Sequence, residues 1–227
     1  MNPGTERMIH DIQFETAESR EWTGISAIEP KVIDALRHTP RDAFVAEEYR
    51  PLAYANHPLP AGYGQTISQP FIVALMTQLL LPQAGHTLLE IGTGTGYQSA
   101  VLARLVKRVI SLELIDALAE RARSLLGTLG VSNVDIYQGD GYLGYPESAP
   151  YDGIIVTACA TEIPRPLFDQ LKPGARMVIP IGPAHGAQEL LLVEKSADGL
   201  PSSRNVLPVA FVPLKRTVDH PNLSPEA

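Results

Sequence analysis

Residues 90–96 read Glu90-Ile91-Gly92-Thr93-Gly94-Thr95-Gly96 and close a short apolar run that begins at Thr87. Directly after the loop, residues 97–106 place apolar side chains at helical spacing. Glycines let a backbone turn tightly after a strand and let it approach a ligand closely. The stretch therefore predicts a strand, a ligand-binding loop and a helix, which together form the first unit of an open α/β sheet.

The same alternation of strand and helix continues along the chain. Strands are predicted over residues 87–91, 108–114, 134–137, 153–156, 177–181, 189–194 and 206–214. Helices are predicted over residues 97–106, 116–129 and 164–171, with a turn at Lys172-Pro173-Gly174. The last two strands are joined by the polar stretch 195–205 without a helix, so one antiparallel member is expected at an edge. The predicted fold is α/β: a Rossmann-like, doubly wound, mostly parallel sheet of about seven strands with an antiparallel edge strand.

The part of the chain before the sheet differs in character. Residues 30–38 and 70–81 have helical periodicity, residues 49–64 are rich in Pro, Gly and Tyr and are predicted to be irregular, and residues 1–24 are polar with no pattern that determines an element. We expect an N-terminal helical region over residues 1–84 and a sheet core over residues 85–227. At 227 residues, the two parts are expected to form one compact domain.

Composition narrows the class of protein. The formal net charge is -7 and basic runs are lacking, which disfavours a nucleic-acid surface. Apolar runs are too short to span a membrane, and the N-terminus lacks the apolar region of a secretory signal. The single cysteine, Cys159, excludes an intrachain disulfide and is expected to be packed rather than reactive. The six histidines lack metal-binding spacing. We expect a cytoplasmic protein, monomeric, with no metal, no membrane and no nucleic acid among its partners.

Three acidic residues accompany the predicted strand ends. Glu113 lies 21 positions after Gly92 (113 − 92), where a carboxylate can accept both hydroxyls of a ribose. Asp140, between two glycines after the third strand, could accept from an adenine amino group. Glu90 would repel a pyrophosphate but could orient an ammonium group, and the third glycine comes one residue too early for the dinucleotide fingerprint. The pattern from Glu90 to Gly96 resembles the first motif of the Rossmann-like methyltransferases, whose cofactor is S-adenosyl-L-methionine.

The segment Gly64-Gln65-Thr66-Ile67-Ser68-Gln69-Pro70 resembles the G-Q-T-I-S-x-P signature of the protein-L-isoaspartate O-methyltransferases. The resemblance continues in order from about residue 28 to residue 214. It is carried by the phrases at residues 41–45, 58–60, 89–98, 139–142, 149–152, 170–174 and 211–214.

This resemblance implies methyl transfer from S-adenosyl-L-methionine to the α-carboxylate of L-isoaspartyl residues in damaged proteins and peptides, with S-adenosyl-L-homocysteine as product. The ester then closes to a succinimide that hydrolyses partly to normal Asp, so the enzyme begins a repair cycle. By resemblance Ser68 is the catalytic residue, and the substrate-binding residues are Thr66, Ser68, Val212, Pro213 and Leu214. The expected cofactor-binding residues are Gln65, Thr66, Ile67, Glu90, Gly92, Thr93, Gly94, Gly96, Tyr97, Gln98, Glu113, Leu114, Asp140, Gly141 and Gln188.

Competing interpretations remain open at this stage. Ser68 before an apolar helical run is also an N-cap signature, and caps are commoner than catalytic serines. The glycine loop alone is compatible with a nicotinamide-dependent oxidoreductase or with a module that binds the cofactor without catalysis. A methyltransferase with another substrate is a further alternative, since fold does not determine substrate.

Overall fold

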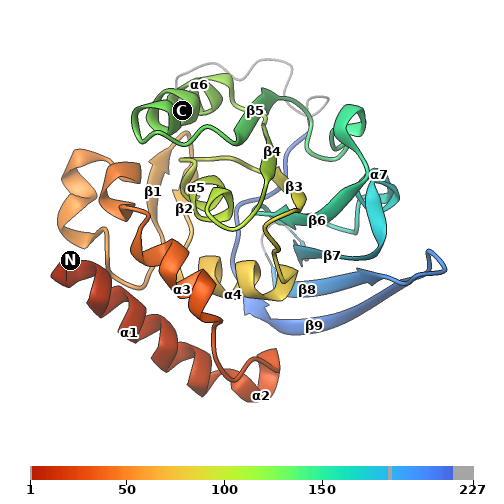
Figure 1. Ribbon diagram of the computed structural model, residues 1–227, viewed down its shortest axis with the longest axis horizontal. Helices are drawn as coiled ribbons and strands as arrows, with labels where there is room; N and C mark the ends of the chain where they lie inside the picture. The colour runs from red at the N-terminus through yellow and green to blue at the C-terminus, as the bar shows by residue number, and fades with distance from the viewer. Residues whose placement is uncertain (1, 184–185, 217–227) are drawn as a thin grey trace.

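The computed structural model describes residues 2–183 and 186–216. Within them the chain builds a seven-stranded sheet in the order β5-β4-β3-β6-β7-β8-β9 (Figure 1). Its strands are β3 (Thr87–Ile91), β4 (Arg108–Glu113), β5 (Val134–Gln138), β6 (Tyr151–Val156), β7 (Leu171–Ile181), β8 (Gln188–Lys195) and β9 (Pro201–Val209).

The strand pairings confirm the predicted α/β fold. Pairs from β5 through β7 are parallel, whereas β7 with β8 and β8 with β9 are antiparallel. The strand that runs against its neighbours is thus β8, and β9 forms the edge beyond it. The chain adds β4 and β5 on one side of β3 and then returns to add β6 on the other side. The switch point therefore lies at the carboxyl end of β3, next to the glycine loop.

Two sequence-based boundaries on this side of the sheet are wrong. The predicted turn at 172–174 lies inside β7, where an irregular register against β6 absorbs the extra residues. The predicted last strand at 206–214 is shifted: β9 begins at Pro201, and residues 211–214 leave the edge and meet Cys159 instead. The first five residues of β9 are exposed, so they lack the apolar alternation by which a strand is found.

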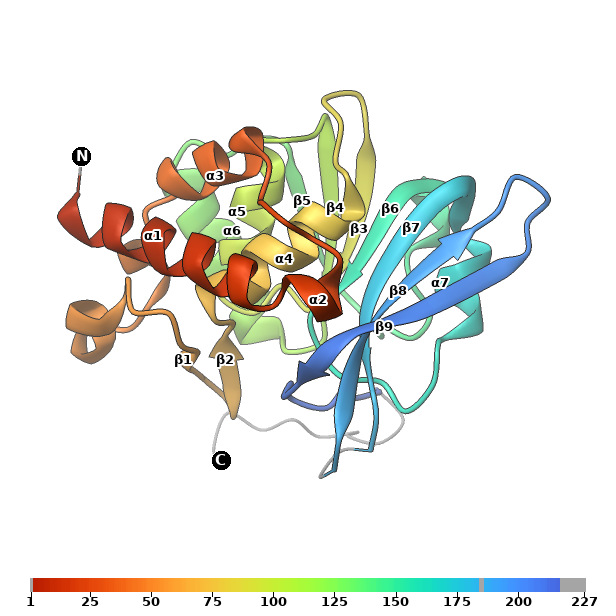
Figure 2. The same ribbon diagram turned by 90° about the horizontal axis from the view of Figure 1, so that it is seen from below.

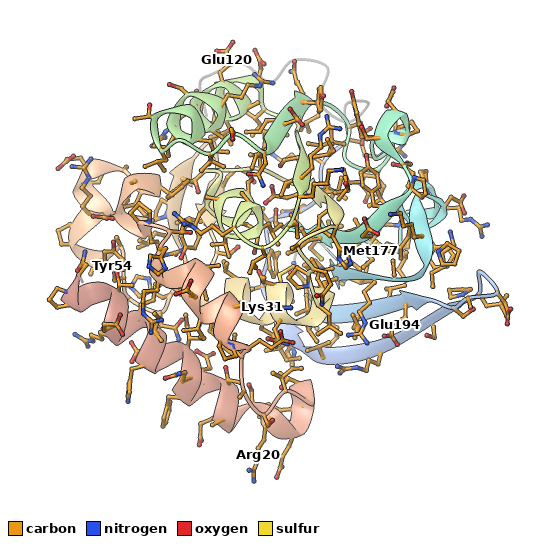
Figure 3. The ribbon with its side chains drawn as sticks, viewed as in Figure 1. Arg20, Lys31, Tyr54, Glu120, Met177 and Glu194 are labelled. Carbon is orange, nitrogen blue, oxygen red and sulfur yellow. The ribbon has the colours of Figure 1, made fainter. Side chains whose placement is uncertain are left out.

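Helices cover both faces of the sheet, as Figure 2 shows. Helices α4 (Pro70–Leu80), α5 (Tyr97–Ala103) and α6 (Asp116–Thr128) lie on one face, and α7 (Arg165–Asp169) lies on the other. Neighbouring residues of a strand point to opposite faces, so Leu88 belongs to one apolar cluster and Leu89 to the other. Figure 3 shows Met177 of β7 inside the molecule and Glu120 of α6 at its outer surface.

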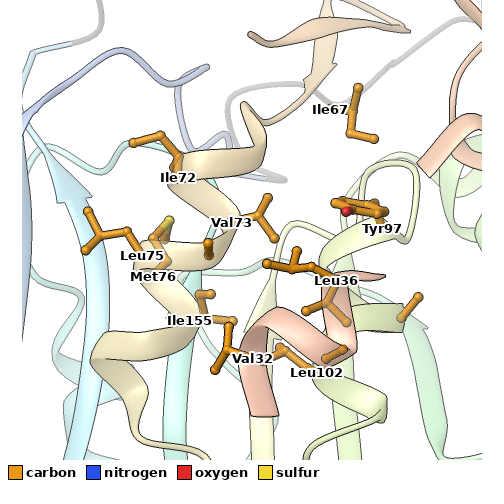
Figure 4. Packing of buried hydrophobic residues seen from close by; sticks show 14 of the residues in the cluster. Val32, Leu36, Ile67, Ile72, Val73, Leu75, Met76, Tyr97, Leu102 and Ile155 are labelled. Atoms are coloured by element: carbon orange, nitrogen blue, oxygen red, sulfur yellow. The ribbon is translucent and has the colours of Figure 1, made fainter. Parts of the chain in front are cut away.

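The N-terminal region is more ordered than its polar sequence indicates. Helix α1 (Pro3–Glu18) buries Met8, Ile9 and Ile12 in the same cluster as α4 and the strand residue Leu88. Helix α3 (Pro30–Arg37) packs there too; Figure 4 shows Val32 and Leu36 beside this core. The remaining short helices are α2 (Arg20–Thr23), η1 (Arg41–Phe44), η2 (Glu47–Leu52) and η3 (Pro146–Ser148).

The stretch predicted to be irregular, residues 49–64, overlaps η2 and contains the first strand and the turn of a β-hairpin. Strand β1 (Leu59–Gly62) pairs antiparallel with β2 (Gln65–Ile67), and Leu59 lies opposite Ile67. Tyr63 and Gly64 form its turn with φ values of 54° and 67°, a left-handed conformation that glycine adopts easily. The hairpin carries the segment 65–68 toward the carboxyl ends of the central strands.

Candidate active site

A pocket opens where the carboxyl ends of β3 and β4 meet the hairpin strand β2 and the segment 212–215. Its walls therefore come from parts of the chain that are far apart in sequence. The lining residues are Gln65, Thr66, Ile67, Ser68, Val73, Ile91, Gly92, Thr93, Gly94, Thr95, Tyr97, Gln98, Leu112, Glu113, Leu114, Ile115, Gly139, Gly141, Thr157, Ala158, Val212, Pro213, Leu214 and Lys215.

The glycine loop is held tightly to the strand ends. The amide of Gly92 donates to the carbonyl of Leu112 at 2.8 Å, and the amide of Gly94 donates to Glu113 Oε2 at 2.8 Å. A Cβ at position 92 would lie 2.4 Å from Thr157 Oγ1, so a side chain cannot be accommodated there without a shift. Gly92 thus lets β3 and the end of β6 approach each other below the pocket.

Glu113 sits at the end of β4, where the spacing from the loop predicts it. Its side chain is 7% exposed, and Oε1 accepts from the amide of Ile115 at 3.0 Å. Burial raises the pKa of this carboxyl, and the backbone amides that bond to it act in the opposite direction. The carboxylate is therefore a fixed acceptor on the pocket wall, and its remaining lone pairs are available for hydroxyl groups.

Glu90 occupies a different place from the one expected. It is 0% exposed and does not line the pocket; Oε2 accepts from the hydroxyls of Ser99 and of Ser111, the latter at 2.6 Å. Ser111 Oγ also bonds to Thr93 Oγ1 at 2.6 Å. Burial raises the pKa of Glu90 to about 7. The structure thus places Glu90 beneath the loop, bracing Thr93 through Ser111, rather than facing a ligand's ammonium group.

Ser68 lines the pocket and does not cap the following helix. The N-cap residue of α4 is Gln69, and the amide of Phe71 in the first turn donates to Asn56 Oδ1 at 3.0 Å. The alternative in which Ser68 serves as the N-cap is therefore wrong. Because the helix end is satisfied from another segment, the Ser68 hydroxyl is left for the pocket.

Most of the predicted site residues come together here. Those that line the pocket are Gln65, Thr66, Ile67, Ser68, Gly92, Thr93, Gly94, Tyr97, Gln98, Glu113, Leu114, Gly141, Val212, Pro213 and Leu214.

Four predicted cofactor residues lie outside the lining. Besides Glu90, Gly96 is the left-handed N-cap of α5 and faces Ala122. Asp140 Oδ1 accepts from the amide of Tyr142 at 2.9 Å, while the glycines on both sides of Asp140 line the pocket. Gln188 is the first residue of β8; its side-chain amide donates to the carbonyl of Phe211 at 3.1 Å and accepts from the amide of Phe211 at 2.6 Å.

The lining residues that were not predicted are Val73, Ile91, Thr95, Leu112, Ile115, Gly139, Thr157, Ala158 and Lys215. Thr157 follows β6, so the rule that ligands meet strand carboxyl ends could have identified it. Lys215 follows the family-like phrase at 211–214 by one residue, without a signal of its own. Within the described lining, Glu113 and Lys215 are the charged residues.

The chemistry of the lining fits S-adenosyl-L-methionine. One buried carboxylate at a strand end suits ribose hydroxyls, and the apolar side chains of Leu112, Leu114 and Ile115 suit an adenine ring. A pyrophosphate would find a single lysine among the lining residues. Residues 2–183 and 186–216 contain no group of three His, Cys, Asp or Glu side chains arranged to hold a metal ion.

Comparisons with known proteins agree with these features. The model of the family described as protein-L-isoaspartate(D-aspartate) O-methyltransferase matches residues 20–219. "Protein-L-isoaspartate O-methyltransferase 2" of Syntrophobacter fumaroxidans is 51% identical, covering 92% of this chain and 84% of the relative. The protein of the same name from Polaromonas sp. is 52% identical, covering 91% of this chain and 98% of the relative.

Solved structures show the same likeness. One protein-L-isoaspartate O-methyltransferase superposes with a TM-score of 0.80 at 30% identity, covering 92% of this chain and 65% of that chain. A Plasmodium falciparum structure, described as a beta-aspartate methyltransferase in complex with S-adenosyl-L-homocysteine, has a TM-score of 0.74 at 23% identity, covering 91% and 98%. The second likeness concerns the fold. Among the helices that the structure describes, none is both long and apolar enough to cross a membrane.

Proposed function

The chain belongs to the protein-L-isoaspartate(D-aspartate) O-methyltransferase family, and on that premise we propose how its pocket performs the family's reaction. The protein is an S-adenosyl-L-methionine-dependent methyltransferase that esterifies L-isoaspartyl residues in damaged proteins and peptides. A nicotinamide-dependent oxidoreductase is not favoured, because relatives at about 50% identity carry the methyltransferase name.

We propose that the cofactor lies along the carboxyl ends of β3, β4 and β5. Glu113 would accept from the ribose hydroxyls, and the loop at 92–94 would face the amino-acid end. Gly139 and Gly141 would bring the backbone close to the adenine ring; a Cβ at position 141 would lie 2.4 Å from Ile91 Cγ2. When bound, the cofactor supplies an electrophilic methyl group on a sulfonium. Glu90, being buried beneath the loop, takes a supporting place in this proposal.

On the acceptor side, the Ser68 hydroxyl would hold and orient the isoaspartyl carboxylate, and Thr66 would be a second contact. The single observation that carries this assignment is that Ser68 lines the pocket while Asn56 caps α4. An ionised carboxylate is already a nucleophile, so a general base is not required. The site has to align the carboxylate with the methyl group and remove its water.

The segment 212–214 offers an edge to the substrate backbone. Val212 accepts from the amide of Cys159 at 2.8 Å, and Leu214 donates to the carbonyl of Cys159 at 2.7 Å. Backbone groups of an extended chain alternate in direction, so those of Pro213 point away from Cys159. Proline has no amide hydrogen. We propose that the Pro213 carbonyl accepts one hydrogen bond from a substrate amide beside the reacting residue.

The test uses two peptides that differ in one linkage. Labelled methyl transfer from S-adenosyl-L-methionine is measured with an isoaspartyl peptide and with the same peptide containing normal aspartate. We expect transfer to the first and background with the second. Equal labelling of both peptides, or none of the isoaspartyl peptide by protein that binds S-adenosyl-L-homocysteine in a calorimeter, would contradict the proposal.

We further propose that the chain acts as a cytoplasmic monomer of one compact domain, with residues 1–84 carrying the acceptor segment. The apolar cluster that joins α1 to the sheet supports a single domain. The whole site is also formed by one chain. Size-exclusion chromatography with light scattering should give the mass of one chain at micromolar concentration; a dimer mass there would refute the monomer.

A further inference from the structure

Arg41 is a fully buried arginine next to the acceptor segment. It begins η1, and its exposed fraction is 0%. Its Nε donates to the carbonyl of Ala53 at 2.8 Å, and its Nη2 donates to the carbonyl of Ser68 at 2.7 Å. One planar guanidinium therefore ties η1 and the chain after η2 to the residue assigned to the methyl acceptor.

The other neighbour of this guanidinium belongs to the cofactor side. Arg41 Cζ lies 4.8 Å from the ring centroid of Tyr97, the first residue of α5 after the glycine loop. Tyr97 is 1% exposed and lines the pocket, and Figure 4 shows its ring near Ile67 of β2. Arg41 thus lies between the segment that would hold the acceptor and the helix that begins at the cofactor loop.

The charge of Arg41 has no counter-charge nearby. Throughout the described residues, no carboxylate forms an ion pair with it, and Nη1 is buried without a hydrogen-bond partner. Taking a charge out of water is unfavourable unless another charge or several hydrogen bonds compensate it. A purely structural tie could be made by neutral side chains at a lower cost.

We propose that Arg41 is a positioning residue for methyl transfer, which fixes Ser68 relative to Tyr97 and uses its unpaired charge to favour the ionised acceptor carboxylate. This inference rests on the proposed function of the pocket. The Ser68 carbonyl is anchored through Nη2, so the backbone from which the Ser68 side chain projects is held in place. A misplacement of about 1 Å in such a site costs on the order of 100-fold in rate.

Two substitutions separate the effect of the Arg41 hydrogen bonds from the effect of its charge. Arg41→Met removes both, and we expect kcat/KM for the isoaspartyl peptide to fall by roughly 100-fold, with KM raised and kcat lowered. Arg41→Lys keeps the charge but not the planar fork, so we expect the loss to fall mainly on kcat, with KM within about threefold. In both variants the affinity for S-adenosyl-L-homocysteine, measured by calorimetry, should stay within about threefold, because Arg41 does not line the pocket.

Arg104→Met is the control for losing an arginine hydrogen bond at an exposed position. Arg104 Nε donates to Thr39 Oγ1 at 3.2 Å, so this change also removes a tie between an arginine and the N-terminal region. Arg104 is not among the pocket residues, and we expect kcat and KM near the wild-type values.

Wild-type protein that does not methylate the isoaspartyl peptide would refute the proposed function itself. With active wild type, the inference is overturned if Arg41→Met or Arg41→Lys turns over like the wild type, or if product affinity falls in parallel with kcat/KM. Where Arg41→Met does not fold, the KM and kcat of Arg41→Lys decide. If neither variant folds, the guanidinium serves the fold and the positioning role is rejected.

Discussion

Asn56 Oδ1 accepts the hydrogen bond that the amide of Phe71 would otherwise offer to a preceding N-cap side chain. Asn56 is itself held by Glu15 of α1, whose Oε2 accepts from Asn56 Nδ2 at 2.6 Å and from Gln69 Nε2 at 2.9 Å. The N-terminal helix therefore completes the first turn of α4 from outside. As a result, the residue one position before the cap, Ser68, is free to face the pocket.

Removing the Ser68 hydroxyl should affect turnover and leave the fold unchanged. For Ser68→Ala we expect kcat to fall by roughly 100-fold, as for the loss of one positioned hydrogen-bond donor. The free energy of unfolding should change by less than about 0.5 kcal/mol, because no cap is lost. The measurements are steady-state methyl transfer and urea unfolding. Wild-type kcat in Ser68→Ala would exclude the role assigned to the hydroxyl.

The matched control is Asn56→Ala, which removes the observed cap. Loss of an N-cap side chain destabilises by about 1 kcal/mol, and Asn56 does not line the pocket. We expect lower stability, with methyl transfer retained at temperatures where the variant is folded. If Ser68→Ala lost as much stability as Asn56→Ala, Ser68 would contribute to capping α4 after all.

The sequence predicts the cofactor half of the site better than its support. The glycine loop and Glu113 belong to one local strand-helix-strand unit, and the periodicity of such a unit is visible in a single sequence. The cap on α4 cannot be predicted in this way. Asn56 lies 15 residues before Phe71, and the two meet only because the β1–β2 hairpin between them folds back. Similarly, Glu90 has the spacing of a ligand residue, but burial directs its carboxylate toward Ser99 and Ser111.

Strand β9 at the sheet edge and helix α1 at the N-terminus were harder to predict, because their sequences carry little apolar pattern. Strand β9 starts with five exposed residues, so its side chains do not alternate between apolar and polar. The strand is formed by its backbone pairing with β8. Helix α1 has few apolar residues, yet Met8 and Ile12 are 0% exposed. In both elements the partner surface, rather than local propensity, selects the structure.

Glu113→Gln should weaken cofactor binding. The carboxylate accepts from the amides of Gly94 and Ile115 at once, and a glutamine can accept at only one of its two terminal atoms. One amide then faces an NH2 group, and the acceptors for the ribose hydroxyls are reduced. We expect the Kd for S-adenosyl-L-homocysteine to rise at least about tenfold, since each 1.4 kcal/mol is a factor of ten. Calorimetric Kd values for the wild type and variant test this, and equal values would contradict it.

Lys215→Met should raise KM for the isoaspartyl peptide. Lys215 is the cation among the described pocket residues and is half-buried, so it can attract the acceptor carboxylate. We expect a KM increase of roughly threefold to tenfold at low salt, with kcat little changed. Added salt screens such attraction, so the difference between wild type and variant should shrink near 0.5 M salt, where the Debye length is about 4 Å. A KM difference independent of salt would indicate a contact other than charge attraction.

Glu90→Gln should change how stability depends on pH. Burial is the main cause that raises the pKa of Glu90 from 4.5 to about 7, while hydrogen bonds from Ser111 and Ser99 lower it and the charge of Glu113 raises it. Below pH 4.5 the carboxyl is protonated in both folded and unfolded chains. Between pH 4.5 and about pH 7 the unfolded chain is ionised at this carboxyl while the folded chain still holds the proton, so stability is lost across this window. A shift from 4.5 to about 7 corresponds to on the order of 3 kcal/mol.

Glutamine is neutral at every pH, so the comparison isolates this one group. The free energy of unfolding of the wild type, minus that of Glu90→Gln, should decline by about 3 kcal/mol between pH 4 and pH 8. Glu113 is present in both proteins, and its own titration largely cancels in the difference. Urea unfolding at several pH values measures the decline. A difference that stays flat across this range would mean that the Glu90 carboxyl titrates alike in the folded and unfolded chains. In that case the hydrogen bonds from Ser99 and Ser111 offset burial, and at neutral pH the loop lies over a charged carboxylate.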